Sequence, residues 1–162
     1  MLRRIPHSML MALVGGGVLF SERVGSLMER ENLLTAPPET TVSAAALLMA
    51  RRKVGAVMVT RDEKLVGIFT ERDVVFRVIA LDLDVKSTLL ADVMTPSPVT
   101  IDPDKSFGYA LLLMHQNGFR HMPVTEDGKP VGMVSARHAL DPDLEEFAAE
   151  SHRREQIMRE MK

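Results

Sequence analysis

Thr70 and Asp73 are the residues of this chain whose types and spacing are best suited to ligand chemistry. Thr70 stands where an apolar run ends and a helical stretch begins, so its amide and hydroxyl are expected at a helix N-terminus. The N–H groups and dipole of such a terminus favour an anion such as phosphate. Asp73 falls one turn further on the same face, and its two oxygens can accept hydrogen bonds from two hydroxyl groups. The alternative is a structural pair, with Thr70 as N-cap and Asp73 as a first-turn acid.

The chain lacks the residue patterns of common catalytic and metal sites. It has no cysteine, which excludes disulfides, thiolate nucleophiles and zinc–thiolate centres and is compatible with a reducing, cytoplasmic location. Its five histidines do not follow a helical zinc-ligand spacing, so no metal site is predicted. The glycines at 15–17 lack the spacing and lysine of a phosphate-binding loop, and no nucleophile–base pair is evident. We therefore expect that the protein is not an enzyme.

An internal repeat occupies the middle of the sequence. A shift of 65 residues, which places Met49 on Met114, aligns residues 35–72 with residues 100–137 without a gap. A repeat of this length is one supersecondary unit, and a single unit rarely buries its apolar face alone. Two copies can pack against each other, and the seam between them is a natural place for a ligand.

Each copy predicts the order strand, helix, strand, strand, helix. An Ala/Leu-rich stretch at 44–52, and its equivalent at 106–116, has strong helical propensity. Two apolar runs across a short polar turn follow each helix and indicate a β-hairpin. A second helix is expected to start at Thr70. The fold class expected is therefore α/β (α+β).

Composition fits one globular unit of two repeats. The chain has 162 residues, of which 46% are hydrophobic and 26% are charged, and this is enough for a sizeable core. The net charge of −2 gives no electrostatic basis for a nucleic-acid or acidic-membrane partner. Aromatic residues make up only 4%, so base-stacking surfaces are not expected either.

Apolar segments lie at both ends. Residues 9–20 follow two arginines like the start of a signal peptide, but the run is too short to span a bilayer and no small-residue cleavage site follows. Residues 141–162 predict a helix with an apolar face. We expect both segments to pack on the repeats or on a partner chain, with a leader or an overextended start as the alternative for the first. The predicted division is an N-terminal apolar extension (1–23), repeat 1 (24–88), repeat 2 (89–140) and a C-terminal helix (141–162).

Two ordered sets of short motifs resemble the tandem cystathionine-β-synthase (CBS) domain pair, or Bateman module. The matching stretches are Asp92-Val93-Met94-Thr95, the corner at 66–73, and Phe119-Arg120-His121-Met122-Pro123-Val124. The resemblance implies two β-α-β-β-α repeats packed about a pseudo-two-fold axis, with helical extensions. It also implies a stand-alone regulatory protein that binds an adenosyl compound (AMP, ADP, ATP, NAD or S-adenosylmethionine) between the repeats. A homodimer and a separate effector protein are further implied partners.

The resemblance also implies the two walls of a ligand site. In this family, a ribose-binding aspartate of one repeat faces strand residues of the other, which here makes Asp73 the ribose contact. The predicted ligand-binding residues are Ile68, Thr70, Arg72, Asp73, Thr100, Ile101, Arg120, His121, Met122 and Pro123. Thr100 would bond the adenine edge, and the two isoleucines and the methionine would supply apolar faces. Arg120 and His121 would meet phosphate, unless they are a solvated charge and a packing residue, respectively.

The second copy departs from this pattern. Ser135 takes the position of Thr70, but His138 takes that of Asp73, and a neutral imidazole offers one acceptor where a carboxylate offers two oxygens. This weaker second half-site is expected to comprise Thr35, Gly55, Ala56, Val57, Met133, Ser135 and His138. We expect it to be empty, weak or differently selective, so that each chain binds one nucleotide.

The sequence thus predicts a non-catalytic module that senses an adenosyl ligand, as in energy sensing, and transmits its binding to a partner by favouring one packing of the repeats. The alternative is a ligand-independent interaction or oligomerisation module with the same fold. Because Asp73 is expected at an exposed cleft position, its replacement by alanine is expected to weaken binding and leave the fold intact.

Overall fold

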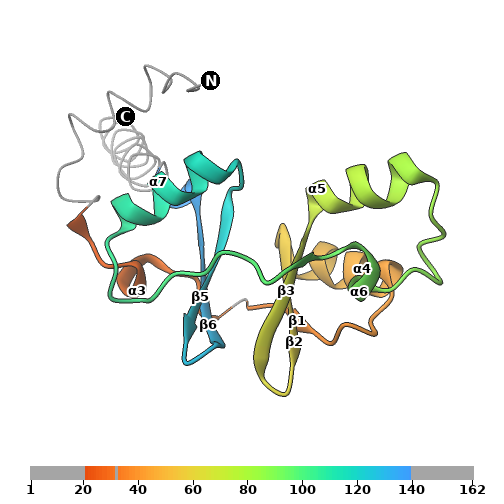
Figure 1. Ribbon diagram of the computed structural model, residues 1–162, viewed down its shortest axis with the longest axis horizontal. Coiled ribbons are helices and arrows are strands. Elements are labelled where there is room, and N and C mark those ends of the chain that lie inside the picture. Colours follow the sequence, from red (N-terminus) through yellow and green to blue (C-terminus); the bar gives the residue numbers. More distant parts are fainter. Residues whose placement is uncertain (1–20, 32, 140–162) are drawn as a thin grey trace, which may run out of the picture.

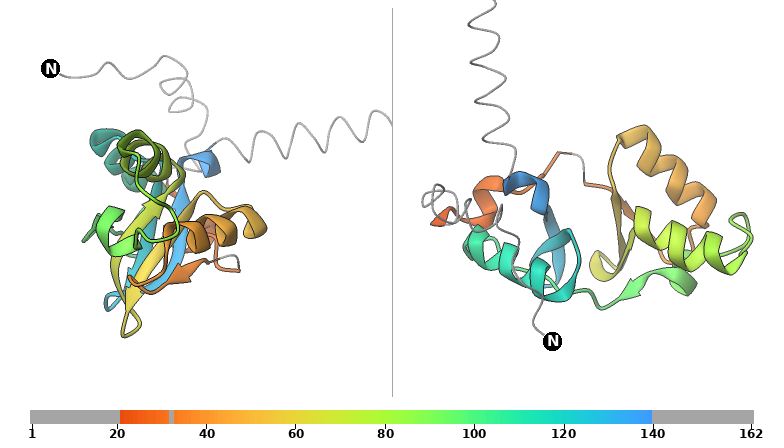
Figure 2. Two further views of the ribbon diagram at one scale, coloured as in Figure 1. Left: turned by 90° about the vertical axis from the view of Figure 1, so that its right-hand side faces the viewer. Right: turned by 90° about the horizontal axis from the view of Figure 1, so that it is seen from above.

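The computed structural model describes residues 21–31 and 33–139, so the apolar run at 9–20 and the helix expected at 141–162 lie outside the described residues. Two lobes lie side by side along the long axis, each with its own β-sheet (Figure 1). The sheets face each other in the middle of the molecule, and the helices lie on their outer sides (Figure 2). In the described part of the chain, no helix is long and apolar enough to cross a bilayer.

The first lobe follows the expected order of strand, helix, hairpin and helix. Its elements are β1 (Thr35–Ala36), α4 (Val42–Arg52), β2 (Ala56–Arg61), β3 (Lys64–Thr70) and a last helix of three successive segments, α5 (Glu71–Asp73), the π-helical η1 (Val74–Val78) and the 3-10 turn η2 (Ile79–Leu81). Helix α4 begins after Thr41, whose hydroxyl accepts a hydrogen bond from the Ala44 amide at 3.3 Å. Strand β1 pairs with β2 in parallel, and β2 pairs with β3 in antiparallel orientation.

The second lobe repeats this order. Its elements are α7 (Phe107–Asn117), β5 (His121–Glu126), β6 (Lys129–Ser135) and the 3-10 turn η3 (Ala136–Ala139). Helix α7 begins after the N-cap Ser106 and ends at Gly118, whose left-handed conformation, with φ of 73°, favours glycine. Ile101 takes the place of β1 through a parallel bridge to Val124. The structure therefore confirms the predicted α+β class with two repeats.

Each sheet ends on a segment that belongs, in sequence, to the other repeat. In the first sheet, the edge strand β4 (Thr95–Pro96) runs antiparallel to β3, with Thr95 opposite Ile68. In the second sheet, Glu29 makes the corresponding antiparallel bridge to Met133 on β6. The predicted boundaries 24–88 and 89–140 therefore follow the sequence repeat but do not separate the two lobes in space.

Two short helices belong to these segments, and each packs into the core of the lobe formed by the other repeat, an arrangement that we call the exchange of segments. Helix α3 (Val24–Leu27) buries Val24 in the core of the second lobe, and Met28 follows it there. Helix α6 (Leu90–Val93) buries Leu90 and Val93 in the core of the first lobe. Burial of an apolar side chain of this size stabilises the fold by about 1.5–3 kcal/mol. Neither lobe therefore has a complete core without the segment that precedes the other repeat.

A methionine packs on a glycine at each of the two exchanges. Met94 lies over Gly67 of β3, and Met28 lies over Gly132 of β6, which is the residue equivalent to Gly67 in the repeat. A Cβ at either glycine would overlap the methionine Sδ. Both glycines are therefore required by close approach of a side chain from the exchanged segment, and the equivalence supports the expected pseudo-two-fold relation.

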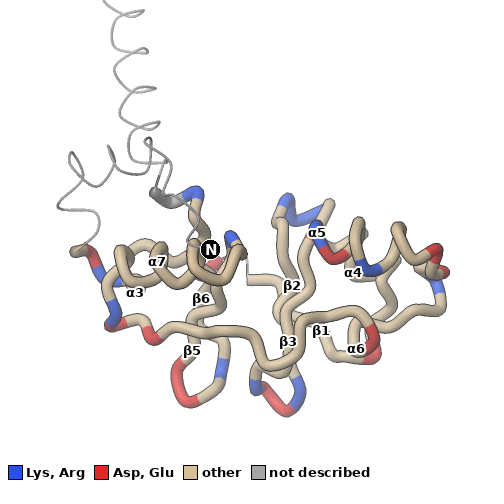
Figure 3. Tube along the Cα trace, turned by 45° about the horizontal axis from the view of Figure 1, so that its top comes forward, with Lys and Arg blue, Asp and Glu red and all other residues tan. Residues whose placement is uncertain are grey.

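The two hairpins lie next to each other at their tips. The Leu65 amide donates to the Gly128 carbonyl at 2.9 Å, and Lys129 Nζ lies 2.6 Å from Glu63 Oε2. The hydrogen bond from Lys129 holds the pKa of the Glu63 carboxyl below its ordinary value. Figure 3 shows acidic and basic residues at both of these tips. The hairpins thus join the lobes at the end opposite α5 and α7.

Gly132→Ala should lower the free energy of unfolding by about 1–3 kcal/mol, because the new Cβ overpacks a buried contact. Gly67→Ala should cost less, since Met94 is only half-buried and its side chain can move, whereas Met28 is buried and its Cβ and Cγ also lie close to Gly132. Urea unfolding of both variants tests this order. A larger loss in Gly67→Ala would contradict the packing account.

Candidate functional site

A cleft of about 400 Å³ lies where the two lobes meet, and it has three walls. The first wall is the corner between β3 and α5, with Arg77 further along the helix. The second is the segment that continues from β4, and the third is the turn from α7 into β5. The lining residues are Gly55, Ile68, Thr70, Glu71, Arg72, Asp73, Arg77, Thr95, Ser97, Pro98, Val99, Asn117, Gly118, Phe119, Arg120, His121 and Pro123.

The N-terminus of α5 carries the polar pair expected from the sequence. Asp73 Oδ2 accepts hydrogen bonds from the Thr70 amide and from the Thr70 hydroxyl, each at 2.8 Å. In return, the Asp73 amide donates to Thr70 Oγ1 at 3.4 Å, which completes a capping box. The structural role considered for this pair is therefore present. Asp73 is only 8% exposed, so the expectation of an exposed position was wrong.

Asp73 has a third partner in the same helix. Arg77 Nε lies 3.2 Å from Asp73 Oδ1. A carboxylate offers about four acceptor positions; Thr70 uses the two on Oδ2, and Oδ1 is in the ion pair with Arg77. A contact in which each oxygen accepts one ribose hydroxyl would therefore require Oδ2 to lose a bond, and the Thr70 hydroxyl is the group that can rotate away.

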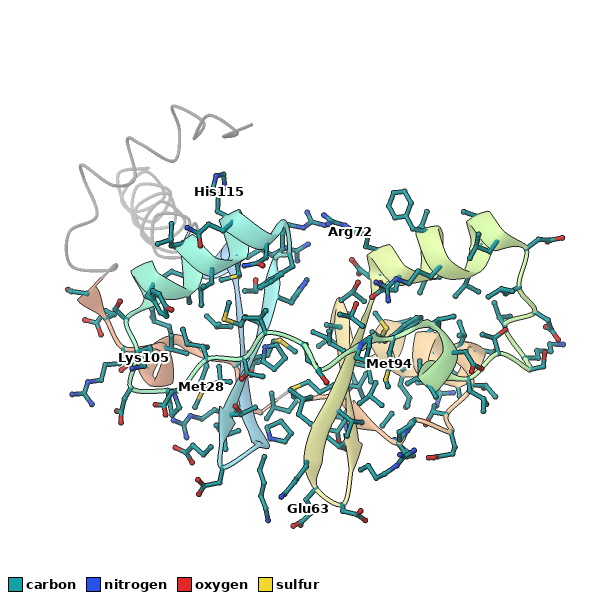
Figure 4. All side chains as sticks on the ribbon, in the orientation of Figure 1. Met28, Glu63, Arg72, Met94, Lys105 and His115 are labelled. Atoms are coloured by element: carbon teal, nitrogen blue, oxygen red, sulfur yellow. The ribbon has the colours of Figure 1, made fainter. Side chains whose placement is uncertain are left out.

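Arg72 crosses the cleft from one lobe to the other. Its guanidinium donates to the Gly118 carbonyl at 2.8 Å, directly after the last turn of α7. Figure 4 shows Arg72 extending from α5 towards the end of α7. A cation is favourable at a helix C-terminus because unsatisfied carbonyls and the helix dipole make that end negative. Arg72 therefore lies in the cleft as predicted and also joins its two sides.

Arg120 and His121 form the opposite wall. Arg120 is exposed and makes no side-chain hydrogen bond or ion pair with the described residues. The His121 ring lies against Gly55, since a Cβ at Gly55 would be 3.3 Å from its Cε1 and Nε2 atoms. Pro123 lies on the same face of β5 as His121 and also lines the cleft. The structure thus brings Ile68, Thr70, Arg72, Asp73, Arg120, His121 and Pro123 together.

Three predicted residues do not line this cleft. Ile101 and Met122 are buried in the core of the second lobe, because each belongs to the sheet face opposite the cleft. Thr100 is exposed, outside the lining. The wall expected from Thr100 and Ile101 is instead formed by residues 95–99, which the exchange of segments carries across the cleft. The prolines at 96 and 98, with Ser97 between them, are the sequence signal for this irregular segment.

The residues expected at the second half-site are dispersed. Gly55 lines the first cleft, Val57 is fully buried in the first core, and Ala56 is buried beside it. Thr35 is exposed on β1. The prediction that these four form one ligand wall is therefore wrong for Gly55 and Val57.

On the other lobe, Met133 is half-buried, and its backbone is bonded to Glu29. The Ser135 hydroxyl accepts a hydrogen bond from the Arg137 amide at 3.1 Å. His138 belongs to η3, but its side chain lies outside the described part. Within residues 21–31 and 33–139, no group of three or more histidine or acidic side chains is arranged to hold a metal ion.

Residues 24–80 and 90–143 each match the CBS domain at the level of sequence. This chain belongs to the CBS-domain family. It is 34% identical over 136 residues to the meiotically up-regulated gene 70 protein of Schizosaccharomyces pombe. The aligned region covers 77% of this chain and 19% of that protein. The chain therefore spans about a fifth of the length of this relative.

Solved structures show the same arrangement. An uncharacterized conserved protein from Pyrococcus horikoshii has a TM-score of 0.71 at 28% identity, over 76% of this chain and 93% of that one. The CBS domain protein PAE2072 from Pyrobaculum aerophilum, crystallised in complex with AMP, has a TM-score of 0.66 at 25% identity, over 72% and 89% of the two chains. The tandem CBS pair inferred from the motifs is thereby confirmed.

Asp73→Ala should lower the free energy of unfolding by about 1–3 kcal/mol, because it removes the acceptor of the capping box and of the Arg77 ion pair. Asp92→Ala is the matched control, since Asp92 also accepts from an N-cap amide, that of Leu89 at 3.2 Å, but is exposed. Its loss should be smaller, as measured by urea unfolding without ligand. Equal losses of unfolding free energy in the two variants would show that the burial of Asp73 does not strengthen its contribution to stability.

Proposed function

We propose that this CBS pair is a non-catalytic sensor that binds an adenosine nucleotide in the cleft and transmits its occupancy to a partner. One observation carries the proposal: the capped N-terminus of α5, with Thr70 and Asp73, lies across the cleft from Arg120 and His121. A helix N-terminus and a cation on facing walls are suited to a phosphate. A volume of about 400 Å³ is within the range of small-molecule sites.

The charges of the cleft favour a nucleoside phosphate over S-adenosylmethionine. Three guanidinium groups, those of Arg72, Arg77 and Arg120, line it together with two carboxylates, those of Glu71 and Asp73. Because Asp73 is paired with Arg77, the remaining charge near the opening is positive. A cationic sulfonium would be repelled there, whereas phosphate would gain charge-assisted hydrogen bonds. The AMP complex of the Pyrobaculum aerophilum protein supports this choice.

Arg72 offers a route by which a ligand can act on the packing of the lobes. Its bond to the Gly118 carbonyl spans the cleft. A phosphate at the N-terminus of α5 would compete with that carbonyl for the guanidinium, since hydrogen bonds to an anionic acceptor are stronger. Release of Gly118 would change the relative stability of two lobe arrangements, as a ligand-driven signal requires.

The apolar face of the last helix of the first lobe is a surface for a second copy of this chain. Val75, Phe76 and Ile79 are all more than half exposed, with Phe76 at 66%. Tyr109 and Leu112 are exposed on α7 in the other lobe. Apolar surface of this extent marks an interaction site, and we propose a homodimer.

Phe76→Glu should shift the mass in light scattering from dimer to monomer, because it places a charge in the apolar surface. A monomeric natural protein would contradict the proposal.

The alternative function is a ligand-independent interaction module. It is favoured by the carboxylate of Asp73, which already has structural partners in Thr70 and Arg77. In that case, Asp73 would serve only to cap α5. Binding measurements separate the two functions directly.

Titration calorimetry should show binding of AMP, ADP or ATP and weaker or no binding of S-adenosylmethionine. Arg120→Ala should weaken nucleotide binding about 10- to 100-fold, because a charge-assisted contact contributes about 1.5–3 kcal/mol. Arg61→Ala is the control, since Arg61 lies at the last position of β2, outside the cleft, and forms its ion pair with Glu39. Absence of binding by any adenosyl compound would favour the interaction module.

Saturation should occur near one nucleotide per chain, because His138 replaces the second aspartate. His138→Asp should raise this stoichiometry towards two, provided that Gly55 and Ala56 leave room for a ligand. Equilibrium dialysis with labelled nucleotide measures both values. Two equal sites in the natural protein would contradict the asymmetry.

A further inference from the structure

Arg77 occupies an unusual position in the helix that carries the candidate site. The π-helical turn η1 begins directly after Asp73 and includes Arg77. Its wide turn is closed by the Ile79 amide, which donates to the Val74 and Val75 carbonyls. Such turns are rare within helices and are frequent at functional sites.

From this turn, the guanidinium of Arg77 reaches two groups at once. Nε lies 3.2 Å from Asp73 Oδ1, and a terminal nitrogen donates to the Val93 carbonyl at 3.1 Å. Val93 is the last residue of α6, and Thr95, two residues later, lines the cleft. Arg77 therefore connects the carboxylate on one wall to the segment that forms another wall.

The two oxygens of Asp73 are held by different groups. Thr70 bonds only Oδ2, through its amide and its hydroxyl. The terminal torsion of an aspartate has a broad energy minimum, so those bonds alone leave the direction of Oδ1 loosely defined. Arg77 is the group that is paired with Oδ1, and beside this ion pair Oδ1 can accept a hydrogen bond from a ligand hydroxyl.

We infer that Arg77 is a positioning residue for nucleotide recognition: it orients Asp73 Oδ1 towards a ribose hydroxyl and, through Val93, holds it at a set distance from the wall at 95–99. This inference rests on the proposed function and adds the group on which ribose recognition depends. Arg77 acts through Asp73 and makes no contact with the phosphate.

The test compares ligands that differ in single groups. Affinities of AMP, 2′-deoxy-AMP, 3′-deoxy-AMP and adenosine are measured by calorimetry for the natural protein, Arg77→Met, Arg77→Lys and the control Arg61→Met. In the natural protein, loss of the hydroxyl that bonds Asp73 should weaken binding about 10- to 100-fold, as for a hydrogen bond to a charged group. In Arg77→Met, this ratio should fall to about threefold or less, and Arg77→Lys should restore part of it because its ammonium can still pair with the carboxylate. Arg61→Met should keep the natural ratio.

The outcomes separate this inference from the proposed function. If Arg77→Met keeps the natural hydroxyl ratio, Arg77 does not position Asp73. If instead the ratio of AMP to adenosine affinity falls and the hydroxyl ratio does not, Arg77 contacts phosphate and the inference is wrong. If the natural protein binds none of the four ligands, the proposed function fails together with the inference. Should Arg77→Met not fold, Arg77→Gln, which keeps a neutral donor, gives the same comparison.

Discussion

The exchange of the segments that carry α3 and α6 is the constraint on which the rest of this structure depends. Val24 and Met28 complete one core, and Leu90 and Val93 complete the other, so each lobe is stabilised by the segment that precedes its neighbour. The route of the chain between the lobes follows from this packing. Because α6 must reach the first core, the residues after it run along β3 and form a wall of the cleft. The site between the lobes is thus a product of the same contacts that hold the lobes together.

The polar groups of the site serve the fold and the proposed ligand at the same time. Thr70 and Asp73 cap α5, and Arg72 caps the end of α7 from the other lobe. These bonds to the protein's own groups restrict the side chains, and restricted side chains lose less entropy on binding. They also limit what the site can do, since Thr70 already uses both acceptor positions of Asp73 Oδ2. One ligand hydroxyl can bond Asp73 Oδ1, whereas a hydroxyl at Oδ2 would have to displace the Thr70 hydroxyl.

Much of this architecture could be predicted from the sequence. The 65-residue shift predicted the two repeats, and the change from an apolar run to a helical stretch predicted Thr70 and Asp73 at a helix N-terminus. Alternation along a strand would also have excluded Met122, since His121 and Pro123 share the cleft face and the residue between them points to the core. The same reasoning applies to Ile68 and Thr70, which flank the buried Phe69.

Other features depend on contacts that no local pattern reveals. The wall at 95–99 arises from the exchange of segments, which is a pairing between distant parts of the chain. Gly55 was predicted to belong to the second half-site because it takes the position of Arg120 in the repeat. In the structure it lies against the ring of His121 and lines the first cleft. The role of Arg77 depends on a π-helical turn, and the sequence alone did not indicate one.

Hydrogen exchange with and without AMP tests the central claim most directly, because it locates the ligand as well as detecting it. Exchange should be slower in three separate stretches when AMP is bound: the start of α5 at 70–73, the wall at 95–99 and the turn at 118–123. Exchange in the hairpin tips should stay unchanged, since they lie at the opposite end of the lobes. Unchanged exchange in all three stretches at saturating AMP, or protection confined to other parts of the chain, would contradict the assignment of this cleft as the nucleotide site.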